Sequence, residues 1–200
     1  YYSRQCIDRF GVHNVTMVDK LESENWRTNP KLREGIDFRL GDFSDDGFMS
    51  TIRRKHELAL AYDVLPHQID LRRAISLMLS KTSRFFLVSN AILPDKLMPF
   101  RNCLILLSGS REQALVPFHE EWTKKTDYWR NFHDPSIVDT EHWLWGISPS
   151  FIESLVTGFG WHLLHREFWR GWLPQDSKWR YCGLIFTRTH GERSEEQPST

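Results

Sequence analysis

The chain has 200 residues, a length that fits one globular domain with a sizeable core. Its 26 Lys and Arg residues balance its 26 Asp and Glu residues, so the formal net charge is zero. Hydrophobic residues make up 40% and charged residues 26% of the chain, which excludes a wholly disordered chain, a collagen and a coiled coil. The charge balance argues against nucleic-acid binding through bulk positive charge and leaves only a local basic patch for that purpose.

The cysteine pattern predicts a reducing environment. Cys6, Cys103 and Cys182 form no CxxC pair and have no metal-ligand spacing. They are too few and too scattered for a disulfide framework, so a cytoplasmic location is expected. No apolar run reaches the roughly 20 residues that a membrane span needs, and no signal peptide is expected. We therefore expect no metal and no membrane segment.

Short helical and strand-like segments alternate along the chain. The clearest helix is at residues 70–81, where Leu71, Ala74 and Ile75 begin an apolar stripe at helical spacing and Asp70 can cap the first turn. The expected helices lie at residues 1–10, 44–54, 70–81 and 151–157, and the expected strands lie at residues 12–18, 36–40, 57–64, 84–92, 161–169 and 181–188. Residues 20–35 are polar and are expected to be a connection broken by Asn29-Pro30.

The strands fall into two kinds. The continuous apolar runs at residues 57–64 and 84–92 predict strands buried on both faces, as parallel strands are. Their alternation with helices predicts a parallel sheet built from βαβ units. The last two strands, at residues 161–169 and 181–188, are close enough in sequence to form a hairpin.

The segment at residues 94–146 interrupts this alternation. It is too long for a simple connection and is rich in aromatic residues. We therefore expect one α/β domain at residues 1–190 that carries residues 94–146 as a lid or cap insertion. The polar residues 191–200 are expected to be a disordered tail.

Polar residues follow the predicted strands at the ends where ligands bind in open α/β sheets. Asp19 ends the first strand, and its carboxylate could either accept both hydroxyls of a ribose or simply be solvated. Gly41-Asp42-Phe43 ends the next strand, where a carboxylate can accept a purine amino group and a ring can stack. The alternative is a turn with a capping Asp, in which Asp42, Ser44 and Asp45 are all possible helix caps. Residues 61–67 end the third strand and place Tyr62, Asp63 and His67 near the middle of the same crevice.

This order of strands and acidic strand ends resembles the class I S-adenosylmethionine-dependent methyltransferases. The likeness covers roughly residues 1–188, and Thr157-Gly158-Phe159 resembles the turn that precedes the sixth strand in this family. The resemblance implies a Rossmann-like three-layer sandwich with a mostly parallel sheet and an antiparallel C-terminal strand pair. It also implies S-adenosylmethionine as cofactor and methyl transfer as the reaction.

The chain departs from the family pattern at its N-terminal end. Tyr1-Tyr2-Ser3-Arg4 resembles the start of the helix that follows the family's glycine-rich loop. The family's first strand and that loop are therefore expected to be missing, and the chain is expected to be an N-terminally truncated fragment. Because the loop brings backbone close to the cofactor, we expect this chain alone to bind the cofactor poorly and to be inactive.

The resemblance also implies roles for individual residues. Asp19 would bind the ribose hydroxyls, Asp42 would bind the adenine amino group, and Phe43 would flank the adenine ring. Ala61 and Tyr62 would lie near the sulfonium. The full expected cofactor site is Asp19, Lys20, Leu21, Gly41, Asp42, Phe43, Ala61, Tyr62 and His67.

The acceptor site is expected under residues 94–146, where the family often carries lids. Candidate bases are His119, His133 and His142, with His142 first because it leads back into the fold core. Trp143 and Trp145 are the expected acceptor-binding residues, and the alternative for all three is a structural aromatic cluster. The aromatic content favours a small aromatic or apolar acceptor, with RNA as a second acceptor class.

Two other functions compete with methyl transfer. A dinucleotide-dependent oxidoreductase, or another nucleotide-binding α/β enzyme, would also carry an acidic residue at a strand end. A non-catalytic methyltransferase-like scaffold could use its Trp-rich segment to bind a partner, since a fold does not fix a function.

Overall fold

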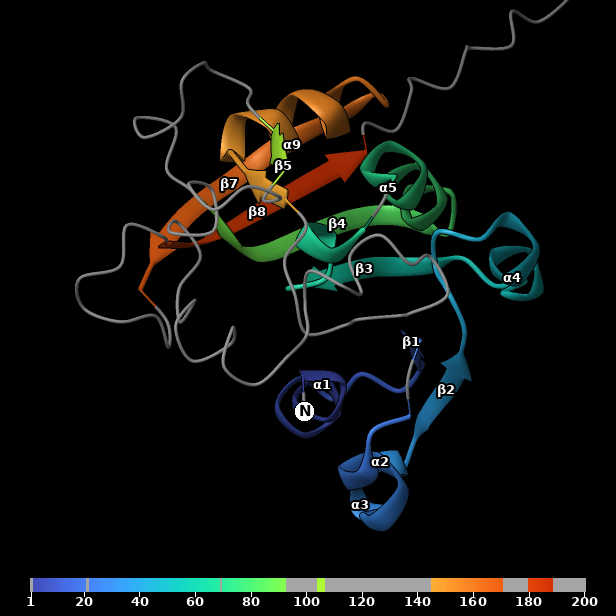
Figure 1. Cartoon of the computed structure of the whole chain (residues 1–200). Helices are drawn as coiled ribbons and strands as arrows, with labels where there is room; N and C mark the ends of the chain where they lie inside the picture. The colour runs from blue at the N-terminus through green and yellow to red at the C-terminus, as the bar shows by residue number, and fades with distance from the viewer. Residues whose placement is uncertain are drawn as a thin grey trace, which may run out of the picture. The chain divides into compact units, whose positions relative to one another are not determined.

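The computed structural model of the chain describes residues 2–20, 22–68, 70–92, 104–106, 145–170 and 180–188. The chain forms two compact units, Tyr1–Arg54 and Lys55–Thr200. Both units combine helices with strands (Figure 1), so the expected α/β class is confirmed at this level.

The first unit contains a parallel pair of strands with helices around it. Its elements are α1 (Tyr2–Phe10), β1 (Val15–Asp19), α2 (Glu24–Thr28), α3 (Pro30–Arg33), β2 (Ile36–Leu40) and α4 (Asp46–Thr51). Strands β1 and β2 run parallel, with Val15 opposite Ile36 and Asp19 opposite Leu40. The carboxyl ends of both strands are therefore level with each other.

The polar stretch at residues 20–35 is not a plain connection, and that prediction was wrong. Ser23 caps α2 by accepting a hydrogen bond from the backbone N–H of Trp26 at 3.2 Å, and Asn29 caps α3 in the same way. Trp26 is buried and lies 5.0 Å from the ring of Phe38, centroid to centroid. Side-chain caps and the buried indole of Trp26 thus stabilise two helices that are too short for an apolar period to be visible in the sequence.

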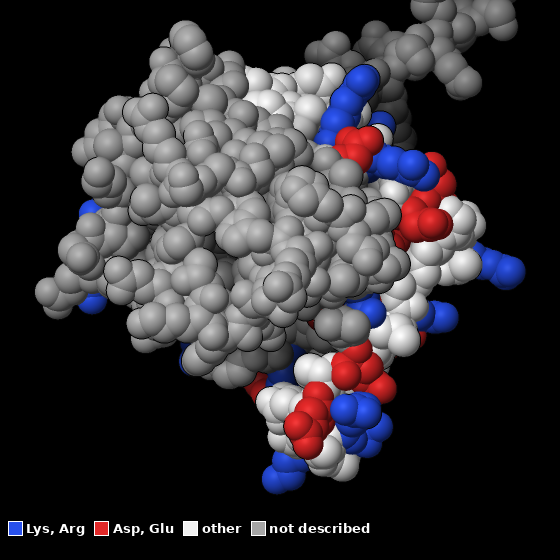
Figure 2. Space-filling model, viewed as in Figure 1, with Lys and Arg blue, Asp and Glu red and all other residues white. Residues whose placement is uncertain are grey.

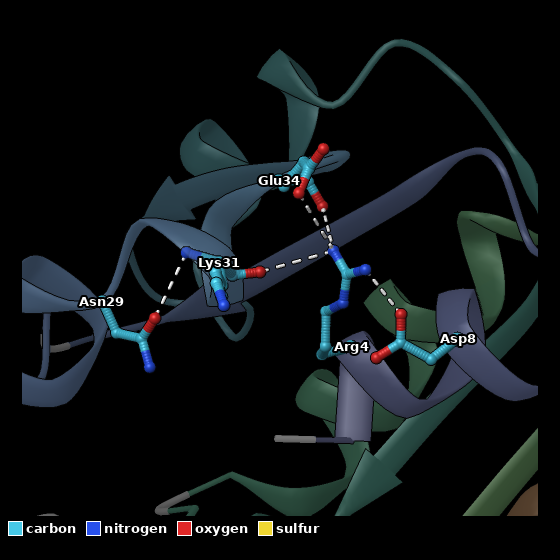
Figure 3. A network of polar contacts seen from close by, with 5 residues as sticks. All are labelled: Arg4, Asp8, Asn29, Lys31 and Glu34. Atoms are coloured by element: carbon cyan, nitrogen blue, oxygen red, sulfur yellow. Dashed lines mark hydrogen bonds and ion pairs between the residues drawn. The ribbon is translucent and has the colours of Figure 1, made fainter.

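Arg4 ties α1 to the end of α3 (Figure 3). Its guanidinium donates to the carbonyl oxygens of Lys31 at 3.3 Å and Glu34 at 3.1 Å, and pairs with the Asp8 carboxylate at 2.5 Å. Donating to the carbonyls at the end of α3 satisfies acceptors that the helix itself leaves unpaired.

The second unit is built on a four-stranded sheet. Its elements are β3 (His56–Tyr62), the short 3-10 helix η1 (Leu65–His67), α5 (Leu71–Ser80), β4 (Thr82–Ile92), β5 (Leu104–Leu106), β6 (Trp145–Ile147), α9 (Pro149–Thr157), β7 (Trp161–Trp169) and β8 (Arg180–Arg188). The strand order is β3-β4-β8-β7, and β5 pairs separately with β6. Strands β3 and β4 are parallel, whereas β8 runs antiparallel to both β4 and β7. The expected antiparallel pair of final strands is therefore present.

Helices α5 and α9 cover one face of this sheet (Figure 1). Their apolar residues, including Ile75 and Ile152, share one buried cluster with the strand residues Ala61, Val88 and Leu184. The helix predicted at residues 70–81 is confirmed, and Asp70 caps it by accepting from the Arg73 backbone N–H at 2.9 Å. The α5/α9 face is therefore the core of the second unit.

Strand β3 is not buried on both faces, contrary to the prediction from its apolar run. Leu58 and Leu60 are 47% and 36% exposed, whereas Ala61 is completely buried. Successive strand residues alternate between faces, and the core helices cover only the face that carries Ala61. Among the described strands β3 pairs only with β4, so it also lies at a sheet edge.

Candidate functional site

The carboxyl ends of β1 and β2 bring the two predicted acidic positions next to each other. Asp19 is the last residue of β1, and its carbonyl oxygen accepts a hydrogen bond from the Gly41 backbone N–H at 2.8 Å. Asp42 follows directly and is partly buried, whereas Asp19 is exposed. Two carboxylates from neighbouring parallel strands thus share one edge of the first unit.

The Asp42 carboxylate is fixed by both of its oxygens. Oδ1 accepts from the Ser44 backbone N–H at 2.8 Å and from the Ser44 hydroxyl at 2.7 Å. Oδ2 lies 2.8 Å from Lys20 Nζ, so the pair joins the ends of β1 and β2. Partial burial acts to raise the pKa of Asp42, but the bonds from Lys20 and Ser44 together outweigh it and lower the pKa below its usual value. The group therefore stays ionised at neutral pH.

Gly41 and Phe43 have packing roles that the sequence did not reveal. A Cβ on Gly41 would overlap the ring of Phe48, so a side chain there would require the ring to move. Phe43 is 9% exposed and therefore presents little of its ring to a ligand. In this unit the absence of a side chain at Gly41 leaves room for the Phe48 ring.

In the second unit, the turn after β3 is clamped to β4. Asp63 has φ 52°, an uncommon conformation for a residue other than glycine. Its backbone N–H donates to the Ser89 carbonyl at 2.7 Å, and its Oδ1 accepts from the Ala91 N–H at 3.3 Å. Asn90 Oδ1 accepts from the Leu65 N–H at 3.4 Å. These bonds hold the turn in a conformation that costs roughly 1 kcal/mol.

A stack of aromatic rings lies beside this turn. Tyr181 is completely buried, and its hydroxyl donates to Asp63 Oδ2 at 3.0 Å. Its ring stacks on Trp169 at 5.8 Å and on Tyr62 at 6.5 Å, centroid to centroid. Tyr62 and Asp63 were predicted site positions, whereas Tyr181, which is 118 residues from Asp63 in sequence, was not. Only the antiparallel pairing of β8 with β4 brings them together.

Two further predicted positions lie in this unit. Ala61 is part of the α5/α9 core, so its methyl group is committed to packing and only its backbone can face a ligand. His67 is half-buried in η1.

Several predicted residues cannot be placed. Leu21, His119, His133, His142 and Trp143 lie outside the described residues, as do most of the segment 94–146 and the whole tail 191–200. Trp145 begins β6, but its side chain is not described. The expected base and acceptor pocket therefore stay predictions.

The described residues show no metal centre, and those visible in Figure 2 show no basic patch. No group of His, Cys, Asp and Glu side chains among them could hold a metal ion. Over the described residues visible in Figure 2, basic and acidic side chains are interspersed. No described helix is long and apolar enough to cross a membrane.

Comparison with known proteins gives matches in structure alone. No family model matches the sequence, and no curated protein matches it. The structure resembles a chain described as a methyltransferase, in complex with the Haloferax volcanii Trm112 methyltransferase activator (TM-score 0.56, 11% identity, 94% of this chain and 77% of that chain). It also resembles a chain described as a sarcosine dimethylglycine methyltransferase from Galdieria sulphuraria (TM-score 0.54, 11% identity, 92% and 73%).

A third similar structure is the Burkholderia thailandensis 1,6-didemethyltoxoflavin-N1-methyltransferase with bound 1,6-didemethyltoxoflavin and S-adenosylhomocysteine (TM-score 0.51, 13% identity, 88% of this chain). The chain spans 62% of the length of that enzyme, which is less than two thirds. Identities this low establish a common fold and do not transfer a substrate. The chain has the fold of the class I S-adenosylmethionine-dependent methyltransferases.

Proposed function

We propose that the chain binds S-adenosylmethionine and takes part in methyl transfer to a small acceptor of aromatic or apolar character. The observation that carries this proposal is the pair of acidic residues at the carboxyl ends of parallel strands: Asp19 ends β1 opposite Leu40, and Asp42 lies two residues beyond the end of β2. Carboxylates at that edge of an open α/β sheet suit the hydroxyl and amino groups of adenosine.

The donor set around Asp42 fits an adenine amino group. A carboxylate can accept about four hydrogen bonds, and Lys20 and Ser44 supply the three described above. One acceptor position is thus left for the adenine amino group without breaking the ion pair. The exposed Asp19 carboxylate is the proposed partner of the ribose hydroxyls.

The chemistry would ask little of the protein beyond orientation. When bound, the cofactor supplies a methyl group on a positively charged sulfur, and an acceptor in line with that bond can take it. Holding the acceptor in line accounts for most of the rate gain, and a base is needed only for a hydroxyl or a protonated amine. His142 is the proposed base, and Trp143 and Trp145 are the proposed acceptor contacts.

The experiment is a calorimetric titration of S-adenosylhomocysteine, the product that the cofactor becomes when it gives up its methyl group. Loss of the hydrogen bonds from ribose to Asp19 in Asp19→Ala should weaken binding about tenfold or more, because each bond to a charged group contributes about 1.5 to 3 kcal/mol. Asp42→Ala should weaken it similarly. Asp37→Ala, which removes an exposed carboxylate of the same strand β2, is the matched control and should leave affinity unchanged.

The expectation that this chain alone binds poorly needs a second sample. A version extended upstream of Tyr1 is titrated beside the 200-residue chain, and the Asp variants are made in whichever form binds. Binding by the extended form alone would support the truncation proposal. Binding of a nicotinamide dinucleotide in place of S-adenosylhomocysteine would favour an oxidoreductase. Binding of neither by either form would contradict the methyltransferase proposal and favour a non-catalytic scaffold.

A further inference from the structure

The two faces of the four-stranded sheet are chemically different at the carboxyl ends of β3 and β4. On β3, Ala61 points into the α5/α9 core, so its neighbour Tyr62 lies on the opposite face. Tyr62 pairs with Ser89, and Ser89 pairs with Gly183. Paired residues share a face, so these side chains lie on the face away from α5 and α9. This aromatic face, as we call it, consists at this end of Tyr62, Ser89, Ala91, Trp169, Tyr181 and Gly183.

Ser89 is the exceptional residue of the aromatic face. It is 4% exposed, and its hydroxyl is a buried group without a hydrogen-bond partner among the described residues. Buried hydroxyls are nearly always paired, because an unpaired one costs roughly 1 to 3 kcal/mol. The hydroxyl therefore has a donor and acceptor capacity that the described residues do not use.

The surroundings of Ser89 favour a flat ligand. Its cross-strand neighbour Gly183 has no side chain, and the Trp169 ring approaches to 3.0 Å from where a Cβ would be. Tyr62, Tyr181 and Trp169 are nearly parallel, with interplanar angles of 22° and 17° along the stack. Stacked rings beside the buried Ser89 hydroxyl match a planar molecule that carries a hydrogen-bonding atom.

The Asp63 turn keeps the stack rigid. The Tyr181 hydroxyl is bound to Asp63 Oδ2, and Asp63 is bound in turn to Ser89 and Ala91 of β4. The Tyr181 ring therefore cannot rotate away from Tyr62 without breaking this bond. Asp63 and Tyr181 act as positioning residues for the aromatic face.

We propose that Tyr62 and Ser89 bind the methyl acceptor, and that the acceptor is a planar conjugated molecule whose oxygen or nitrogen pairs with the Ser89 hydroxyl. The assignment of this ligand as the acceptor rests on the proposed methyltransferase function, whereas the existence of a site for a planar ligand does not. The family resemblance implies that Tyr62 itself is near the cofactor sulfonium, which is the reason for assigning the planar ligand as the acceptor.

Three probe molecules separate the contribution of a planar shape to binding from the contribution of a hydrogen bond. They are 2-naphthol, which is planar with a hydroxyl, naphthalene, which is planar without one, and decahydro-2-naphthol, which has the hydroxyl but is not planar. Ligand-observed NMR titrations of the full chain should show the tightest binding for 2-naphthol. Its advantage over naphthalene should be about threefold to tenfold, the value of one net hydrogen bond.

Matched variants then locate the site. Ser89→Ala should remove the advantage of 2-naphthol while leaving naphthalene binding unchanged. Tyr62→Leu should weaken both planar probes. Phe168→Leu removes a 47% exposed ring of β7. It is the control because Phe168 neighbours Trp169 and so lies on the other face of the sheet. It should change none of the affinities.

The outcomes are distinct from those of the cofactor experiment. Equal binding of the three probes, or an undiminished 2-naphthol preference in Ser89→Ala, would overturn the inference even if S-adenosylhomocysteine binds. Probe binding with the expected variant pattern but no cofactor binding would keep the planar site and remove its assignment as a methyl-acceptor site. Amide exchange of β4 in each variant checks that loss of binding does not come from unfolding.

Discussion

The hydrogen bond between Tyr181 and Asp63 should be a measurable source of stability in the second unit. Tyr181→Phe removes the hydroxyl and keeps the buried ring with its contacts to Tyr62 and Trp169. Hydrogen bonds to charged groups contribute about 1.5 to 3 kcal/mol. Because Asp63 is only half-buried, water can replace part of the lost bond, and we expect a loss of about 1 to 2 kcal/mol.

Hydrogen exchange is the suitable assay because it reports on the second unit separately from the first. Amides in β4 and β8 should exchange about tenfold faster in Tyr181→Phe under conditions in which opening is the pre-equilibrium. Thr187→Val is the control, because it deletes an exposed hydroxyl on the same strand β8. That hydroxyl donates to the Arg84 carbonyl at 3.3 Å. This variant should change exchange rates much less.

A double-mutant cycle tests whether the Tyr181 hydroxyl acts through Asp63. Asp63→Gly removes the carboxyl group and tolerates the positive φ, so Tyr181→Phe made in that background should have little further effect. If Tyr181→Phe accelerates exchange equally in both backgrounds, the hydroxyl stabilises the unit through some other contact. The positioning role given to Asp63 would then be wrong.

Three other predictions concern the first unit. Gly41→Ala should destabilise it by about 1 to 3 kcal/mol through overlap with the Phe48 ring, and Phe48→Ala made in addition should recover part of that loss in a urea titration. Lys20→Met should reduce stability at neutral pH. The folded-state pKa of Asp42 is lowered, so the contribution of the pair is present above the ordinary carboxyl range and is lost as pH falls through the native pKa. An unchanged difference between wild type and Lys20→Met at low pH would contradict this reasoning. Arg4→Met should speed amide exchange at the end of α3, because Arg4 binds the carbonyl oxygens there. Equal exchange rates in the variant and the wild type would contradict this prediction.

The sequence predicted correctly those elements that are determined by residues close together in the chain. The stripe of α5 and its Asp70 cap lie within one helix and were predicted correctly. The acidic strand ends were also readable, because a strand followed by Asp19 or by Gly41-Asp42 is a contiguous pattern. Where a cap and one buried side chain decide the outcome, as in α2, the apolar period is too short to detect.

Features that depend on strand order were not readable in the same way. The exposure of Leu58 follows from which face α5 and α9 cover, and the sequence of β3 does not contain that information. The bond between Asp63 and Tyr181 needs β8 to lie next to β4, although four described elements separate these strands in the chain. Only the candidate positions, such as Tyr62, could be predicted, and not their neighbours.

The backbone at Asp63 explains why the aromatic face depends on this residue. Glycine would adopt φ 52° without strain, so the conformation alone does not require aspartate. The carboxyl group, however, binds β4 through Ala91 and β8 through Tyr181. Two such bonds exceed the roughly 1 kcal/mol of backbone strain, so aspartate is favoured here for its side chain. Asp63→Asn keeps one oxygen acceptor and should retain more of the stability than Asp63→Gly. If the two variants were equally stable, relief of strain in the glycine variant would have to match the lost bonds, and a rigid stack would no longer follow from this turn.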